Sequence, residues 1–156
     1  MQPNFVAAPE PALRFPVGLL GAVLATLVMD RVMARLPEGE TPPQVASGVL
    51  TGAHPDDAPQ RLATVVHYLA GGLTGPLFVW LLYAGEFLVG GPTPVTTLSV
   101  GVVLLVLMIG FFVGVVLPRS RLRSTRRAPV ARDWTLSALA YLFVLVPVVH
   151  LGTALL

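Results

Sequence analysis

The 156-residue chain is 54% hydrophobic and only 12% charged, whereas an ordinary soluble domain carries about 25% charged residues, so a soluble enzyme is disfavoured from the start. The chain has no cysteine and no lysine, which excludes disulfides, thiolate metal centres, cysteine nucleophiles, lysine Schiff bases and P-loop lysines. Its length allows one domain, and its formal net charge of +2 comes from arginines that slightly outnumber the acidic residues.

Four apolar stretches are long enough to cross a bilayer, which takes about 20 mostly apolar residues in a helix. Backbone groups in lipid must be satisfied within the segment, so these stretches are predicted to be helices. We expect an all-α integral membrane four-helix bundle, with one transmembrane domain over residues 15–156 and a disordered or surface-bound arm over residues 1–14. The four predicted spans are residues 15–36, 62–89, 95–117 and 134–156.

The first loop, residues 37–61, contains a predicted short helix over residues 42–50. Thr41 can cap this helix, Pro42 suits its first turn, and Gly52 suits its end. One side of the helix is apolar, which predicts that it lies at the membrane surface or packs under the bundle.

Rows of small residues at i+4 spacing run along three of the spans. Membrane helices approach closely where side chains are small, so helix packing is expected at these positions. The row of the first span leads to Asp30, and the row of the second span begins at His67. The remaining members are Gly18, Ala22 and Thr26 in the first span, Gly71 and Gly75 in the second, and Gly110 and Gly114 in the third.

Asp30 and His67 are predicted to meet, because an inward first helix and an outward second helix place them at nearly the same depth. An aspartate inside a span is costly unless it is paired, and it points to a functional site. Two interpretations stay open: a structural lock between the helices, or a functional pair that is proton-responsive or part of a proton relay. Glu86 is expected to be a solvated residue at the opposite interface.

Residues 90–94, with the sequence GGPTP, predict a short turn that makes the second and third spans antiparallel neighbours. The loop over residues 118–132 then carries six arginines and no acidic residue. It is interpreted as a topology determinant or as a binding site for anionic lipid headgroups; nucleic acid is not expected, because no aromatic interleaving accompanies the charges. Asp133 is expected to cap the fourth helix. The six arginines are Arg119, Arg121, Arg123, Arg126, Arg127 and Arg132.

The placement of arginine predicts the orientation of the chain. The two long loops share one side of the membrane, and with the adjoining helix ends that side holds nine arginines, whereas the other side holds only Arg14. Short cytoplasmic loops are enriched in arginine. We expect a multi-pass protein of the cell membrane with both termini outside.

The segment ATLVMDRVM at residues 25–33, followed by LPEGETPPQVASGVLTG and HPDDAP, resembles small, mostly uncharacterised four-helix membrane proteins of halophilic archaea. Some of those resemble accessory subunits of haem-copper terminal oxidases. The resemblance implies a similar bundle and a place beside such an oxidase, and it carries over no catalytic residue.

We expect a small integral membrane protein without catalysis, metal or cofactor of its own. Its expected partners are the lipid bilayer, anionic headgroups and other membrane subunits or further copies of itself. The leading role is that of an accessory or assembly subunit of a larger membrane complex, with a respiratory terminal oxidase as the leading candidate. The alternative is a small transporter or proton-responsive channel that uses Asp30 and His67.

Overall fold

The computed structural model describes residues 11–155, and every regular element in that range is a helix. Four of the helices are long and apolar enough to cross a membrane. The prediction of an all-helical, multi-pass membrane protein is confirmed at that level. The four helices are α1 (Pro11–Met33), α3 (Gln60–Val89), α4 (Pro94–Phe111) and α6 (Ser124–Ala154).

Shorter elements complete the connections. The first loop holds α2 (Thr41–Thr51) and the 3-10 turn η1 (Pro55–Asp57). The α4 helix continues without a break into the π-helical segment η2 (Phe112–Val116) and the short α5 (Leu117–Arg119). Single-turn π segments inside α-helices are rare and are frequent at functional sites.

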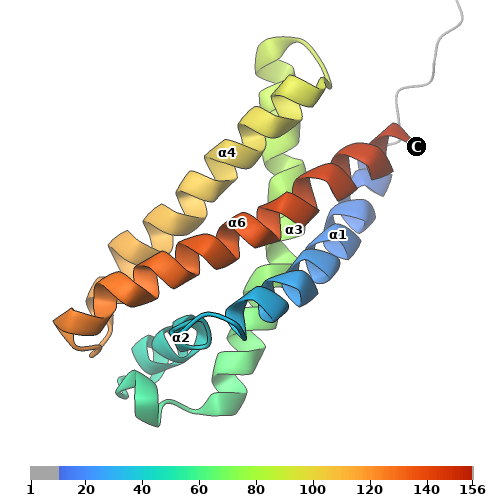
Figure 1. The fold of residues 1–156 in the computed structure, drawn as a ribbon. Coiled ribbons are helices and arrows are strands. Elements are labelled where there is room, and N and C mark those ends of the chain that lie inside the picture. The colour runs from blue at the N-terminus through green and yellow to red at the C-terminus, as the bar shows by residue number, and fades with distance from the viewer. Residues whose placement is uncertain (1–10, 156) are drawn as a thin grey trace, which may run out of the picture.

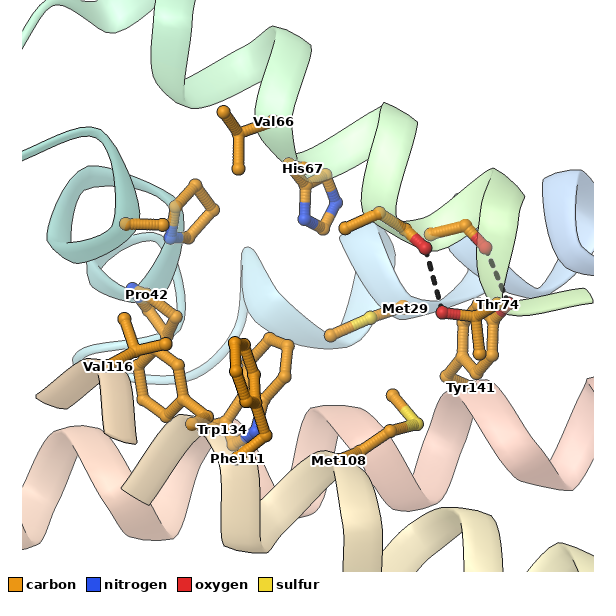
Figure 2. Close-up of a pocket in the computed structure, with 15 residues that line it drawn as sticks. Met29, Pro42, Val66, His67, Thr74, Met108, Phe111, Val116, Trp134 and Tyr141 are labelled. Carbon is orange, nitrogen blue, oxygen red and sulfur yellow. Dashed lines mark hydrogen bonds between the residues drawn. The ribbon is translucent and has the colours of Figure 1, made fainter. Parts of the chain in front are cut away.

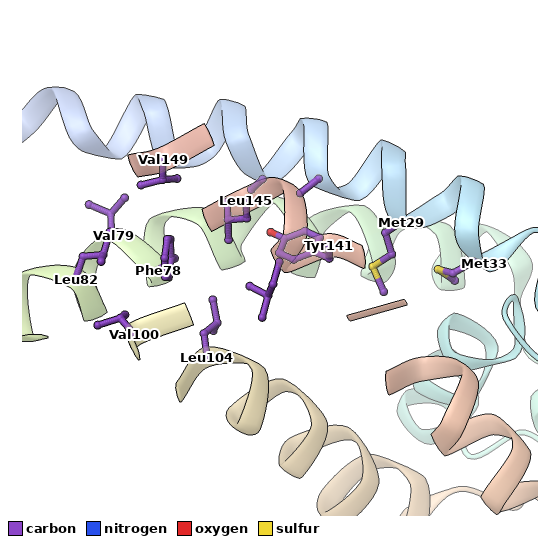
Figure 3. Packing of buried hydrophobic residues seen from close by; sticks show 13 residues of the cluster. Met29, Met33, Phe78, Val79, Leu82, Val100, Leu104, Tyr141, Leu145 and Val149 are labelled. Carbon is purple, nitrogen blue, oxygen red and sulfur yellow. The ribbon is translucent and has the colours of Figure 1, made fainter. Parts of the chain in front are cut away.

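The four long helices form a closed ring in which α1 packs on α3 and α6, and α4 packs on the same two helices. Figure 1 shows α3 and α4 side by side at the turn that joins them and diverging from there, with α2 beneath the gap. The core of the bundle takes buried side chains from all four helices, including Met29, Phe78, Leu104 and Tyr141 (Figure 3).

Contact between α1 and α3 is made by the predicted small residues. A Cβ on Gly18 would lie 2.6 Å from Cγ2 of Val79, and a Cβ on Gly75 would overlap the Gly18 carbonyl oxygen. One turn further along, a Cβ on Gly71 would overlap the Thr26 hydroxyl. The two backbones can approach this closely only because the small residues of both rows face each other.

The α1 helix also packs against α6 through glycine. A Cβ on Gly21 would lie 3.2 Å from Cγ1 of Val148, and a Cβ on Gly152 would lie 2.6 Å from Cγ1 of Val17. The first and the fourth long helices of the described chain are therefore direct neighbours.

Gly110 and Gly114 do not take part in packing within the chain, contrary to the prediction. Both are exposed, and a Cβ added at either would meet nothing within 4 Å. Sequence spacing identified them as a small-residue row, but α4 and η2 turn this row away from α3 and α6.

The α2 helix forms where it is predicted and packs under the bundle. Gly52 ends it in the left-handed conformation, with φ 72°. Thr41 is not its cap, because Thr41 lies within the helix and its hydroxyl donates to Oε2 of Glu38 at 2.6 Å. Val45 is fully buried against a second apolar cluster that includes Phe112 of η2 and residues of α6.

The fourth span begins ten residues earlier than predicted, at Ser124 instead of Trp134. Much of the predicted arginine loop is thus helix, and only residues 120–123 remain between α5 and α6. Asp133 lies inside α6 and does not cap it. The described part of the predicted N-terminal arm, residues 11–14, is also helical.

Candidate functional site

Asp30 of α1 and His67 of α3 lie together where these two helices pack against each other. Nε2 of His67 is 2.7 Å from Oδ1 of Asp30. The hydroxyl of Tyr68 donates to the other carboxylate oxygen, Oδ2, at 2.7 Å. The sequence interpretation missed Tyr68, although it directly follows His67. Both oxygens of the aspartate are thus paired across the α1–α3 contact.

His67 borders two different spaces. One is a hollow of about 430 Å³ at the surface, lined by polar groups that include Asp30, Gln60 and Tyr68. The other is a cavity of about 210 Å³ inside the bundle, lined mainly by apolar side chains. The Asp30–His67 pair therefore stands between a polar hollow and an apolar cavity.

The apolar cavity lies between α3 and α4, and α2 closes one end of it (Figure 2). The tilted rings of Phe112 and Trp134 stack with centroids 4.7 Å apart. The Tyr141 hydroxyl donates to the Gly71 carbonyl at 2.7 Å. Nε1 of Trp134 is buried and has no hydrogen-bond acceptor.

A network of charges joins the first loop to the start of α6. Arg126 donates to both carboxylate oxygens of Glu38, at 2.9 and 2.7 Å, and to Oδ1 of Asp56 at 3.1 Å. The hydrogen bond from Arg126 lowers the pKa of Glu38, so this carboxylate is ionised at neutral pH. Asp133 is fully buried and accepts from the backbone N–H of Glu38 at 2.8 Å and from Arg132 Nε at 2.8 Å.

Part of the basic segment over residues 118–132 is therefore bound within the protein. Arg126 is part of the packed structure. Arg119 and Arg127 donate to backbone carbonyls of Val115 and Leu122, at 2.6 and 3.3 Å. Arg121 and Arg123 are exposed and remain available for solvent or lipid headgroups.

The opposite end of the bundle holds a second ion pair. Nη1 of Arg14 donates to both carboxylate oxygens of Glu86, at 2.9 and 2.7 Å, and the side chains are only 6% and 15% exposed. Glu86 is therefore not the solvated residue that was expected. His150 lies at this end too, with Nδ1 3.2 Å from the Thr97 hydroxyl.

Within residues 11–155, no three histidine or acidic side chains come close enough together to hold a metal ion. The ion pairs of these residues instead form three separate sets, at Asp30, at Glu38 and at Arg14. The first borders the cavity and the hollow, so it is the candidate functional site of the described chain.

No protein-family model, no curated protein and no solved structure matches this chain.

Proposed function

We propose that the chain is a non-catalytic integral membrane subunit that binds another membrane protein through the outer face of α4 and η2. The observation that carries this proposal is the contrast among the glycines of the long helices. Gly18, Gly71 and Gly75 each face a neighbour that leaves no room for a Cβ, whereas Gly110 and Gly114 face open space. Glycine weakens a helix interior, and a partner helix that approaches this face gives the two exposed glycines the same role as the buried ones.

The larger complex that fits best is a respiratory terminal oxidase, with the chain as an accessory or assembly subunit. The support is the resemblance of residues 25–60 to small four-helix membrane proteins, some of which resemble accessory subunits of such oxidases. Exposed apolar side chains beside the two glycines, including Val106 at 61% and Phe111 at 62%, suit contact with lipid or with a second membrane protein.

The test is co-purification from native membranes with the double substitution Gly110→Leu and Gly114→Leu. We expect the variant to keep the thermal stability of the isolated chain, because both sites are open, and to lose its partner. Ala84→Leu is the control, since Ala84 is exposed on a different helix. Haem absorbance in the co-purified complex would identify an oxidase.

Full retention of the partner by the double variant would contradict the proposal. If the unsubstituted chain is recovered only as a homo-oligomer, with no other protein bound, the accessory role would be contradicted. The outer face of α4 and η2 would then bind a second copy of the chain.

We propose that the protein lies in the cell membrane with both termini outside the cell, because nearly all of its arginines lie on the side of the two long loops. Single cysteines at Ser124 and Asn4 test this in a chain that has no cysteine of its own. An impermeant thiol reagent added to intact cells is expected to label position 4 and to spare position 124. The reverse labelling pattern would show that the orientation is inverted, and permeabilised cells, in which both sites must react, are the control.

A second function is favoured by one observation, the position of His67 between the polar hollow and the apolar cavity while it is bound to Asp30. This arrangement suits a proton-responsive channel or transporter. Proton flux into liposomes that is present in the unsubstituted chain and lost in Asp30→Asn would favour this function over the accessory role.

A further inference from the structure

The apolar cavity between α3 and α4 is long and narrow. Its lining runs from Val66 to Thr74 on one side and from Met108 to Val116 on the other, and each run covers about 12 Å of helix. Figure 2 shows Pro42 and Val116 at one end of the cavity and Thr74 at the other. A volume of about 210 Å³ spread over this length suits an extended chain better than a compact ring.

The cavity follows from the course of the helices. Near the turn between α3 and α4, a Cβ on Gly85 would lie 2.7 Å from Cγ2 of Val100, so the two helices are in close contact there. At the other end α2 contacts both α3 and η2, and Pro42 and Ala46 of α2 close the cavity. The space between the two membrane helices is therefore held open by α2.

The polar side chains of the lining are already occupied. The hydroxyls of Tyr141 and Thr74 each donate to a backbone carbonyl of α3 at 2.7 Å, and His67 is bound to Asp30. Nε1 of Trp134 is itself buried. Among the described residues that line the cavity there is no arginine, aspartate or glutamate, and burying an unpaired charge is costly. An uncharged hydrocarbon segment is thus the chemistry that this lining accepts.

The cavity opens toward the bilayer. Ala70 of α3 and Phe111 of α4 line it near the middle of its length, and both are exposed on candidate membrane spans. An apolar cavity stays dry, and the lining of an empty one loses van der Waals contacts. Lipid acyl chains are the material next to this opening, and they can restore those contacts.

We propose that the cavity holds one acyl chain of a membrane phospholipid, inserted between α3 and α4 from the bilayer. The headgroup stays outside the bundle, because the lining offers it no charged side chain. A free fatty acid carries the same chain, and the experiment distinguishes the two sources. The proposal goes beyond the accessory role, and it is tested on the isolated chain, so its outcome does not depend on any partner protein.

The experiment uses the full chain in micelles of a steroid-based detergent, which has no acyl chain to compete for the cavity. Phosphatidylcholine with bromine atoms at mid-chain is titrated in, because bromine quenches tryptophan emission on close approach. Trp134 lines the cavity, and a Trp80→Phe background isolates its emission, since the chain has only two tryptophans. Trp80 is 61% exposed on α3 and, in a Trp134→Phe background, reports lipid at the outer surface.

Quenching of Trp134 should saturate, because one chain fills the cavity. A chain inside the bundle has protein contacts on most sides, whereas a chain at the surface has them on one side. We expect half-maximal quenching of Trp134 at a lipid concentration about tenfold below that for Trp80. Bound lipid should also raise the melting temperature of the chain.

Three leucine variants locate the site. Ala46→Leu fills the cavity from α2, and Ala70→Leu narrows its opening, so each should remove the saturable quenching of Trp134. Ala84→Leu is the matched control, because Ala84 is also exposed on α3 but lies outside the lining. It should keep both the quenching and the lipid-dependent rise in melting temperature. Melting curves without lipid show that each variant is folded.

Quenching of Trp134 that only follows that of Trp80, without saturation at lower lipid, would overturn the proposal. Saturable quenching that survives in both folded variants, Ala46→Leu and Ala70→Leu, would do the same by placing the chain elsewhere. Saturation by a brominated fatty acid but not by the brominated phospholipid would exclude the phospholipid as the source.

Discussion

Gly75→Ala is expected to lower the free energy of unfolding by about 3 kcal/mol, the upper part of the range for overpacking a tight contact. The added methyl group would overlap the carbonyl oxygen of Gly18 and lie 2.7 Å from Cβ of Ala22. Backbone atoms cannot turn aside as a side chain can, so α1 and α3 must separate. Denaturant or thermal unfolding in detergent micelles measures the loss.

Gly110→Ala is the matched control, because the same methyl group meets open space there. Alanine is the better helix former by about 1 kcal/mol, so this variant should be unchanged or slightly more stable. Equal stability of the Gly75 and Gly110 variants would contradict the close approach of α1 to α3.

The contact between α1 and α3 can also be tested by disulfide crosslinking, which does not require a stability measurement. A Cβ on Gly71 would lie 3.4 Å from Cβ of Thr26, next to the 3.5–4.5 Å range of disulfides. Cysteines at these two positions should therefore crosslink under mild oxidation. A pair at Thr26 and Gly72, one residue further round α3, should crosslink much more slowly.

The second large effect is expected at Asp133. Asp133→Leu should lower the free energy of unfolding by about 2 kcal/mol, because it leaves the part-buried N–H of Glu38 without its acceptor. Asp133→Asn keeps an acceptor oxygen and loses only the pairing with Arg132, whose side chain is 63% exposed. Only the Arg132 side of this pair faces solvent, because the Asp133 side chain is 0% exposed, and the asparagine variant should lose less stability than the leucine variant since the hydrogen bond to Glu38 remains.

Unfolding curves of the two Asp133 variants, measured side by side, test this explanation. If asparagine is as damaging as leucine, the charge of Asp133 matters and its hydrogen bond to the first loop does not. If neither variant loses stability, the first loop is not anchored to α6 through this residue.

The elements that sequence could predict are those determined by local pattern. Apolar run length identified four membrane helices, and Pro42 with Gly52 bounded α2 to within one residue at either end. The shared depth of Asp30 and His67 follows from counting residues along two antiparallel helices, and the structure places them 2.7 Å apart.

The elements that sequence could not predict depend on contacts between distant segments. Asp133 looked like a cap because the apolar run starts just after it, but its partner Glu38 is 95 residues away. Arg126 looked like a loop charge for the same reason, since its partner Glu38 is 88 residues away in the sequence. The outward turn of Gly110 and Gly114 depends on the rotation of α4 against its neighbours, which residue spacing does not determine. The cavity at Trp134 exists only because α3 and α4 diverge.

The packing of α1 directly against α6 has a consequence for biosynthesis. The ribosome makes α6 after the other three spans. Until α6 is inserted, Gly21 and the rest of the α6-facing side of α1 have no helix packed against them. The backbone N–H of Glu38 likewise has no side-chain acceptor until Asp133 of α6 has been synthesised. Helix insertion can precede helix association in the bilayer, and exposed partly folded intermediates are prone to misassembly. Emergence of α6 is thus the step that completes the bundle, because α6 contacts both α1 and α4.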